Sequence, residues 1–332
     1  MQFNIALIGG SGFIGTRLVK RLIESGHKIK ILDKAQSQTY PDLWFETDVR
    51  DKSVLFSSFQ RCDVIYNLAA EHRDDVTPRS LYDEVNVKGA ENVCSVADEL
   101  CIRKIIFTSS VAVYGFTSQE TDESGELKPF NDYGRTKLEA EKVYQNWQGK
   151  GEGRSLTIVR PTVVFGEGNR GNVYSLLNQM ANERFIMVGS GRNVKSMAYV
   201  ENVAAFLSFS LNFGGGCRLF NSIDKPDFDM NTLVSVVRKQ LGKTGDIGLR
   251  VPYVMGYVGG LFFDVISKLV KKRFPISAIR IKKFCSNTQF TSSKIKETGF
   301  VSPFTLEEGL NRTIQYEFIN PRNENEVVFY TE

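Results

Sequence analysis

Apolar and polar positions follow two alternating patterns across the first half of the chain. Short apolar runs predict five strands, and the gaps between them carry the three-to-four-residue apolar spacing of amphipathic helices. The predicted strands are 3–8, 28–32, 64–68, 104–108 and 156–159. The predicted helices are 13–25, 53–60, 81–100 and 133–147. Strands that are apolar throughout are typical of a parallel sheet covered on both faces, so this pattern predicts a doubly wound α/β fold.

The alternation of predicted strands and helices changes after about Gly166. Glycine-rich loops interrupt it at 166–171, 189–191 and 214–216. A chain of 332 residues is long enough for two domains. We expect a first domain of residues 1–165, to which part of 196–225 returns. We expect a second, smaller domain made of residues 166–195 and 226–332.

The composition is that of an ordinary globular protein, with 42% hydrophobic and 24% charged residues. It excludes a disordered chain, a collagen and a multi-span membrane protein. The net charge of +4 is too small to support nucleic-acid binding. Five scattered cysteines without a Cys-x-x-Cys pair predict reduced, mostly buried thiols. Two histidines are too few for a histidine-based zinc site, and the N-terminus lacks a signal peptide, so we expect a cytoplasmic protein.

Three glycines spaced GxxGxxG directly follow the first predicted strand and open the first predicted helix. Gly9 permits a tight turn, and Gly12 lets a pyrophosphate approach backbone N–H groups at the helix N-terminus. Gly15 lets the helix and the strand lie close together. Phe13 and Ile14 complete this predicted cofactor turn. The alternative is a glycine turn that serves only the internal contacts of the fold.

The second predicted strand leads into Asp33, whose carboxylate would accept hydrogen bonds from the adenosine ribose hydroxyls. It would repel a 2′-phosphate, which favours NAD over NADP, although Lys34 weakens that preference. Asp48 and Val49 are expected near the adenine, while a helix N-cap explains Asp48 almost as well. Ala69 follows the next predicted strand and is also expected to contact the cofactor.

Tyr133 and Lys137 are four residues apart on a predicted helix and therefore share one face. The ammonium of Lys137 can stabilise a tyrosinate and lower the pKa of Tyr133. Ser109 and Ser110 follow the strand 104–108 at its carboxyl end, where doubly wound sheets bind ligands. A serine hydroxyl there could bond the same substrate oxygen that Tyr133 deprotonates.

In this order, the motifs resemble the extended short-chain dehydrogenase/reductase family of nucleotide-sugar epimerases and dehydratases. Besides the glycine turn, the matching stretches are Asn67-Leu68-Ala69-Ala70, Asn86-Val87 with Gly89, Ser109-Ser110 with Val113-Tyr114-Gly115, Tyr133 with Lys137, and Arg160-Pro161-Thr162. The resemblance covers nearly the whole chain. It implies a Rossmann fold with a smaller C-terminal substrate-binding domain, and NAD as the cofactor. It also implies that Tyr133 is the general base, that Ser110 is its hydroxyl partner, and that Lys137 tunes it and binds the nicotinamide ribose.

Four further stretches look closest to the 4-epimerases of N-acetylglucosamine diphosphate substrates in bacterial O-antigen assembly. They are residues 70–75, 169–174, 195–200 and 282–285. The implied reaction removes the proton of the sugar 4-hydroxyl through Tyr133 while the C4 hydride moves to NAD. The 4-keto sugar then turns over and takes the hydride back on its other face. The implied substrate is N-acetylglucosamine joined through a diphosphate to a polyprenyl lipid.

The same resemblance suggests where that substrate would lie. Thr162, Asn172, Lys195 and Arg280 match positions that face the sugar or its phosphates, although each also fits a solvated or structural role. Thr288 falls at a gate position, where a small side chain leaves room for a 2-acetamido group. We expect His72 to be structural rather than part of the cofactor pocket. Relatives often dimerise through the helices that match 81–100 and 133–147, so we expect a homodimer.

Residues 253–270 form an apolar run with one acid and one base, and seven basic residues without an acid lie between Lys268 and Lys283. The run is barely long enough to cross a bilayer, and Asp264 and three glycines oppose a membrane-spanning helix. Two interpretations remain open. The run is either a buried helix with its cations in water, or an interfacial element on the cytoplasmic face of an anionic membrane.

Several other functions compete with lipid-linked epimerisation. They are the same reaction on UDP-N-acetylglucosamine, a 4-keto-sugar reductase, a dehydratase, a non-catalytic NAD-sensing protein and a basic nucleic-acid binder. Asp132 precedes Tyr133, as an acid often does in dehydratases, but a Thr-Asp-Glu set near Ser110 is absent. The intact Ser110, Tyr133 and Lys137 argue against a non-catalytic protein.

Overall fold

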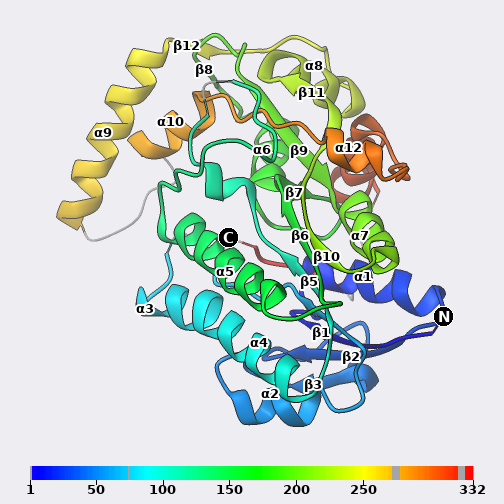
Figure 1. The fold of residues 1–332 in the computed structure, drawn as a ribbon. Coiled ribbons are helices and arrows are strands. Elements are labelled where there is room, and N and C mark those ends of the chain that lie inside the picture. The colour runs from blue at the N-terminus through cyan, green and yellow to red at the C-terminus, as the bar shows by residue number, and fades with distance from the viewer. Residues whose placement is uncertain (1, 74, 118, 271–276, 321–325, 332) are drawn as a thin grey trace.

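The computed structural model describes residues 2–73, 75–117, 119–270, 277–320 and 326–331, without the side chains of 268 and 269 (Figure 1). Seven parallel strands form the main sheet, in the order β10-β6-β5-β4-β1-β2-β3. Their bounds are β1 Asn4–Ile8, β2 Lys28–Asp33, β3 Trp44–Glu46, β4 Val64–Asn67, β5 Lys104–Thr108, β6 Ser155–Pro161 and β10 Gly216–Ser222. The predicted doubly wound Rossmann fold is thus confirmed.

Helices cover both faces of this sheet. One face carries α2 (Lys52–Ser58), α4 (Gly89–Glu99) and α5 (Asp132–Gly149), whose apolar sides share one buried cluster with the strands. The other face carries α1 (Phe13–Glu24) and α7 (Val200–Phe209) over a second cluster. Because both faces are buried, the strands consist of almost continuous apolar residues, which is why the sequence pattern revealed them.

The predicted helix 81–100 is interrupted in the structure. It consists of α3 (Ser80–Tyr82), a π-helical segment Asp83–Lys88 and then α4. The end of this segment lies where Gly89 meets Val49, and a Cβ on Gly89 would approach the Val49 side chain to 2.8 Å. Two short 3₁₀ segments, Pro41–Leu43 and Ser210–Asn212, also lie in this half of the molecule.

The remaining elements form a second layer at the carboxyl ends of the strands (Figure 1). Its strands are β7 Val163–Phe165, β8 Met187–Val188, β9 Val194–Tyr199, β11 Asp224–Asp229 and β12 Arg250–Val251, in sheets β11-β9-β7 and β12-β8. Its helices are α6 Asn172–Ala181, α8 Met230–Gln240, α9 Tyr253–Val270, α10 Ala278–Cys285, α11 Ser293–Glu297, α12 Leu306–Ile314 and the π-helical Gln315–Ile319. A third buried cluster holds this layer together around Leu177, Tyr199 and Leu310.

The cysteines correct one expectation. All five are free thiols, but only Cys62 and Cys94 are buried. Cys101 is exposed at the turn after α4, where its φ is 55°, and Cys217 is exposed on β10, the edge strand of the sheet. The expectation of mostly buried thiols is therefore wrong, because turns and edge strands leave small side chains open to solvent.

Candidate active site

The glycine turn joins β1 to α1, and two of its glycines are required by the chain itself. Gly9 has a φ of 76°, and a Cβ there would lie 2.7 Å from the backbone nitrogen of Ala69. A Cβ on Gly15 would overlap the carbonyl oxygen of Gly9. These two positions therefore fix how closely α1, β1 and the loop after β4 approach one another.

Gly12 is different, because nothing in the described part of the chain requires a glycine there. Its φ is −76°, and among the described residues a Cβ would meet only the carbonyl oxygen of Gly9, at 3.4 Å. Gly12 is also the N-cap of α1 and offers no side-chain cap, so the first N–H groups of the helix point into this space. The buried hydroxyl of Ser11 beside it has no hydrogen-bond partner among the residues that the structure describes. A cradle of open amides suits the pyrophosphate of a dinucleotide.

Asp33 lies at the end of β2, next to this cradle. Its carboxylate accepts hydrogen bonds from the backbone N–H groups of Ser11 and Ala35, both at 3.1 Å. Burial raises the pKa of Asp33, and the two amide bonds oppose that rise. Lys34 turns aside, with its ammonium 3.6 Å from Glu71. The carboxylate is thus held at the edge of the turn, where an adenosine ribose would approach it.

The other positions expected to bind the cofactor are held by different contacts. Asp48 pairs with Arg50 at 2.7 Å, which holds the pKa of Asp48 below its usual range. The N-cap of α2 is Asp51 and not Asp48, because Asp51 accepts the N–H groups of residues 53 and 54. The N-cap explanation of Asp48 is therefore wrong. Val49 is buried, and its contact with an adenine stays a prediction, as does that of Ala69.

The structure brings Ser110, Tyr133 and Lys137 to one edge of the sheet. Ser110 follows β5 and is the N-cap of the 3₁₀ segment Val111–Tyr114, where its Oγ accepts the N–H of Ala112 at 3.1 Å. Tyr133 lies in the first turn of α5 and shares a hydrogen bond with the Ser110 side chain. Lys137 is buried one turn further on, with its Nζ 4.3 Å from the centre of the Phe107 ring.

The pKa shifts of Tyr133 and Lys137 differ from the expectation that Lys137 lowers the pKa of Tyr133. Burial raises the pKa of Tyr133, and the hydrogen bond with Ser110 only partly offsets it. Burial also lowers the pKa of Lys137 to about 7, against the opposing effect of Glu141. The expected lowering of the tyrosine pKa by Lys137 is therefore absent from the protein by itself, because desolvation acts on both groups.

A buried polar network that the sequence analysis missed lies behind these residues. Arg160 on β6 binds both carboxylate oxygens of Glu141 on α5, at 2.8 and 2.5 Å, and the two side chains are only 3% and 1% exposed. Arg160 also donates to the hydroxyl of Tyr114 at 2.6 Å, and that hydroxyl donates to Asn221 at 2.8 Å. Arg160, a cation directly after the apolar strand 156–159, was the signal that could have indicated a buried acidic partner.

This network connects the two elements that carry the candidate catalytic groups. Tyr114 ends the 3₁₀ segment that Ser110 begins, and Glu141 lies two turns after Tyr133 on the same face of α5. The guanidinium of Arg160 therefore links the 3₁₀ segment that begins after Ser110 to α5 through hydrogen bonds.

Lys195 does not extend freely into solvent. Its ammonium donates to the carbonyl oxygens of Lys283 at 2.7 Å and Ser286 at 2.5 Å, and so caps the C-terminal end of α10. Burial lowers the pKa of Lys195 to about 8. Thr288 forms a β-bridge with Lys195, which places the predicted gate residue beside this lysine. A contact of either residue with phosphate or sugar stays a prediction.

The remaining predicted substrate residues are spread around the second layer. Thr162 is buried after β6, and its backbone N–H donates to the carbonyl of Ser222 at 3.1 Å. Asn172 begins α6, and Arg280 lies on the exposed side of α10. His72 lies in the loop after β4, with its ring 6.5 Å from that of Tyr133. His72 is thus next to the candidate catalytic tyrosine, although the expectation assigned it no part in the pocket.

A Rossmann sheet with an amide cradle after β1 and a Ser–Tyr–Lys group after β5 defines an NAD-dependent enzyme that acts on an alcohol. The chain belongs to the NAD dependent epimerase/dehydratase family, whose model matches residues 5–221. NAD is therefore its cofactor, and the orphaned amides, Ser11 and Gly12 fit that group.

Two curated relatives and two solved structures agree with this assignment. The chain is 47% identical, over 100% of both chains, to N-acetyl-alpha-D-glucosaminyl-diphospho-ditrans,octacis-undecaprenol 4-epimerase of Escherichia coli O157:H7. It is 28% identical to UDP-glucose 4-epimerase of Vibrio cholerae, over 95% of each chain. The fold matches UDP-glucose 4-epimerase of Thermotoga maritima, solved with UDP-glucose, at a TM-score of 0.75 and 21% identity, over 94% of this chain and 98% of that one. It also matches UDP-glucuronic acid 4-epimerase of Bacillus cereus, solved with NAD, at 0.73 and 19%, with the same coverage.

Proposed function

We propose that the protein inverts C4 of N-acetylglucosamine joined through a diphosphate to a polyprenyl lipid, as a step of bacterial O-antigen assembly. The full-length similarity to the undecaprenol-linked 4-epimerase carries this proposal, because it spans the substrate layer as well as the NAD domain. The juxtaposed Ser110 and Tyr133 support it by supplying the acid–base groups that the reaction needs.

In this proposal Tyr133 takes the proton of the sugar 4-hydroxyl, and Ser110 donates a hydrogen bond to the same oxygen. NAD, held at the amide cradle after β1, would supply hydride transfer from C4 and back to it. The raised pKa of Tyr133 makes it a poor base in the protein alone, so positive charge near its hydroxyl is needed for proton transfer. Lys137, one helical turn further along α5, would supply part of that charge when protonated, and a bound oxidised nicotinamide would add to it. Tyr133 returns its proton when the 4-keto group is reduced on the opposite face.

One experiment separates this function from its rivals. Purified protein is incubated without added cofactor, once with polyprenyl-diphospho-N-acetylglucosamine and once with UDP-N-acetylglucosamine, and the products are analysed for the C4 epimer. We expect epimer from the lipid-linked sugar. Turnover of the UDP-sugar alone would contradict the lipid-linked substrate, and a strict need for added NADPH would favour a 4-keto-sugar reductase.

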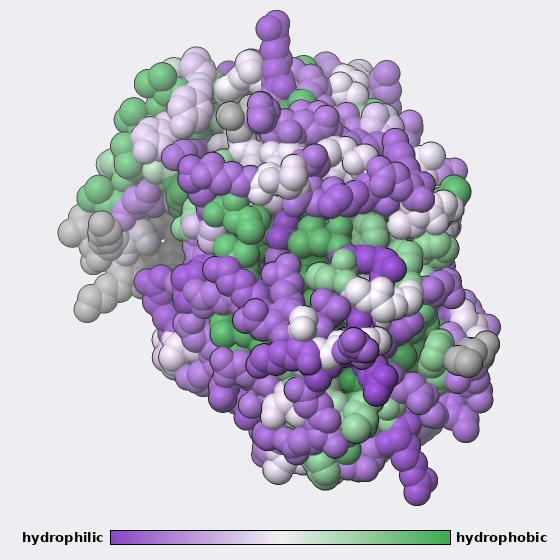
Figure 2. Space-filling model, in the orientation of Figure 1, coloured by the Kyte–Doolittle hydropathy of each residue, from purple (hydrophilic) through white to green (hydrophobic). Residues whose placement is uncertain are grey.

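A surface of the second layer supports a membrane-linked substrate. Six large apolar side chains on α9 are 45–68% exposed: Val254, Met255, Val258, Leu261, Phe262 and Val265. The inner face of α9 is held by α10, because Gly260 lies against Ala278 and Asp264 accepts the Ala278 N–H at 3.1 Å. In Figure 2, green surface gathers over this part of the molecule. The outward face of α9 is thus apolar and has no partner within the described residues.

We propose that this face lies on the cytoplasmic surface of the inner membrane. Arg280 and Lys282 on the adjacent α10 are exposed cations that suit anionic headgroups. The basic residues Lys271, Lys272 and Arg273 lie outside the described part of the chain. In that described part, no helix combines the length and the apolarity needed to cross a bilayer.

Sedimentation with anionic liposomes tests this surface. We expect the intact protein to bind, and the double substitution Val258→Asp and Phe262→Asp to remove binding. Val301→Asp is the matched control, because Val301 is equally apolar and even more exposed but lies far along the chain from α9. Equal binding of all three proteins would contradict the proposed surface.

We also propose a homodimer formed through α4 and α5, which lie side by side on one face of the sheet (Figure 1). The support is that both helices carry exposed positions, such as Glu91 on α4 and Lys142 on α5. Light scattering after gel filtration tests it, and a monomer at all concentrations would contradict it.

A further inference from the structure

The last described residues of the chain return to the middle of the molecule, between its two layers (Figure 1). The N–H of Phe329 donates to the carbonyl of Gly168 at 2.8 Å, and the N–H of Arg170 donates to the carbonyl of Phe329 at 2.8 Å. This short parallel bridge joins residues 326–331, here called the tail, to the loop between β7 and α6. The tail is therefore held against the body of the protein.

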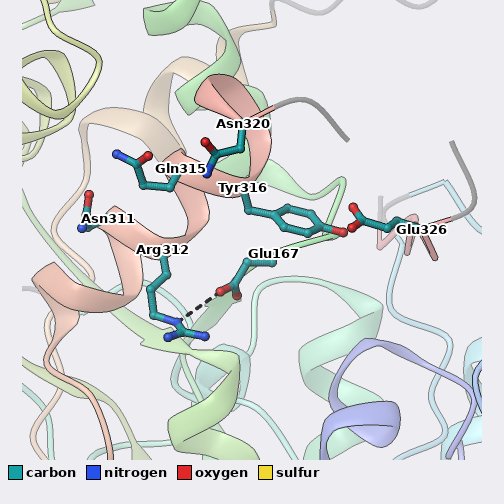
Figure 3. A pocket seen from close by; sticks show the side chains of 7 residues that line it. All are labelled: Glu167, Asn311, Arg312, Gln315, Tyr316, Asn320 and Glu326. Carbon is teal, nitrogen blue, oxygen red and sulfur yellow. Dashed lines mark ion pairs between the residues drawn. The ribbon is translucent and has the colours of Figure 1, made fainter. Parts of the chain in front are cut away.

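The start of this tail is anchored as well. Glu326 shares a hydrogen bond with the hydroxyl of Tyr316, at a polar cavity of ≈ 390 Å³ (Figure 3). The lining of that cavity is Glu167, Asn311, Arg312, Gln315, Tyr316, Asn320 and Glu326. Arg312 and Glu167 form an ion pair of 3.3 Å in its lining. Residues 326–331 thus begin on the second layer, at a site lined by polar side chains.

On its other side the tail contacts the NAD domain. The ring of Phe329 lies 5.7 Å from that of Phe13, and the Nε2 of His72 donates to the carbonyl of Thr331 at 2.9 Å. The Thr331 hydroxyl donates to Asn169 at 2.7 Å. A Cβ on Gly171 would lie only 2.6 Å from the same hydroxyl, so the loop makes room for the tail.

The two contacts with the NAD domain lie near the two ends of the path that a bound dinucleotide would follow. Phe13 directly follows Gly12, the residue of the pyrophosphate cradle, and His72 has its ring 6.5 Å from Tyr133. A dinucleotide with its pyrophosphate at the cradle and its nicotinamide at Tyr133 must run between these points. The segment Phe329–Thr331 runs between the same two points.

We propose that residues 327–331 form a clasp over bound NAD, which slows release of the cofactor. The clasp joins the two layers through Phe329 and Thr331, so the dinucleotide leaves only when these contacts open. Slow release of NAD would not limit the turnover rate of an epimerase, because the cofactor ends each turnover in the state in which it began. The inference depends on the cofactor and not on the identity of the sugar.

The test measures cofactor release without any sugar, so its outcome is independent of the proposed substrate. Protein loaded with NAD is diluted into buffer with an NAD-consuming enzyme, and the rate of NAD loss is followed for four proteins. They are the intact chain, a chain lacking residues 327–332, Phe329→Ala and Tyr330→Ala. Tyr330 is the matched control, because it belongs to the same tail but is 76% exposed.

We expect release to be about tenfold faster for Phe329→Ala, as for loss of a half-buried aromatic contact, and faster still for the shortened chain. Tyr330→Ala should release NAD like the intact chain. Thermal unfolding of the NAD-free proteins checks that each variant is folded, and Phe329→Ala keeps the test decisive if the shortened chain is not. Unchanged release by Phe329→Ala would overturn the clasp. Slower release or tighter NAD binding after shortening would also overturn it, because the tail would then be an obstruction.

Discussion

The two layers of the molecule hold their functional side chains in different ways. Around α5, Lys137, Glu141 and Arg160 are buried and bound by side chains from several elements. In the second layer, Lys195 is held by backbone carbonyls, and Arg280 and the outer face of α9 are exposed. The difference indicates that the NAD half provides a fixed frame for the chemistry. In the proposed function, the exposed groups of the second layer would face the lipid-linked sugar.

The sharpest test of that frame is Tyr133→Phe. Loss of the hydroxyl removes the proposed acid–base group, so kcat should fall by about three orders of magnitude. NAD content should stay that of the intact protein, because the cradle after β1 is untouched. Product formation and bound NAD are measured on the same preparation. Turnover near that of the intact protein would overturn the role of Tyr133.

Breaking the buried Arg160–Glu141 pair should lower the free energy of unfolding more than breaking a similar pair at the surface. Arg160→Met leaves the carboxylate of Glu141 buried without its cation, and we expect a loss of about 3–5 kcal/mol in the free energy of unfolding. The matched surface pair is Arg135 with Asp83, which are 38% and 50% exposed. Asp83→Asn should cost less than about 1 kcal/mol. Urea denaturation measures both, and equal losses would contradict the contrast.

Alanine substitutions distinguish Gly15, which the fold requires, from Gly12, which we expect to contact NAD. Gly15→Ala places a Cβ against the Gly9 carbonyl and should destabilise the fold by about 2 kcal/mol. Gly12→Ala meets no such obstacle, so its unfolding temperature should barely change. Its Kd for NAD should rise about tenfold, because the methyl group occupies the cradle. Normal NAD binding by Gly12→Ala would show that the pyrophosphate lies elsewhere.

The smallest effect concerns pH. Burial lowers the pKa of Lys137 to about 7 in the folded chain, against about 10.5 when unfolded. The unfolded chain therefore binds more protons between these values, and stability contributed at this site rises with pH from about 7 to 10.5. The intact protein should gain about 1 kcal/mol per pH unit relative to Lys137→Met. Urea denaturation of both at pH 7 and pH 9 measures the difference, and an intact protein that does not gain stability relative to Lys137→Met over this range would contradict the lowered pKa.

The sequence pattern located the five central strands and the turn at Gly9–Gly15, because buried parallel strands carry unbroken apolar runs. It missed β3 and β10, which are edge strands with polar residues such as Glu46 and Arg218. It also missed the π-helical break at Asp83–Lys88, which lies next to a tertiary contact with Val49.

The candidate site was predictable where its parts are neighbours in the sequence. Tyr133 and Lys137 are one helical turn apart, and Ser110 stands at a strand end. Two features were not predictable, because they depend on contacts between distant segments. The first is the cap that Lys195 forms on α10, 88 residues away along the chain. The second is the meeting of Phe329 with Phe13.

The way α9 is attached has a practical consequence for handling the enzyme. Its inward face meets the body through two glycines, Gly256 against Val188 and Gly260 against Ala278. Within the described residues, its outward side chains make none of the contacts that shape the NAD cradle or the surroundings of Tyr133. Polar substitutions on the outer face of α9 should therefore favour a more soluble protein for crystallisation without changing the surroundings of Tyr133.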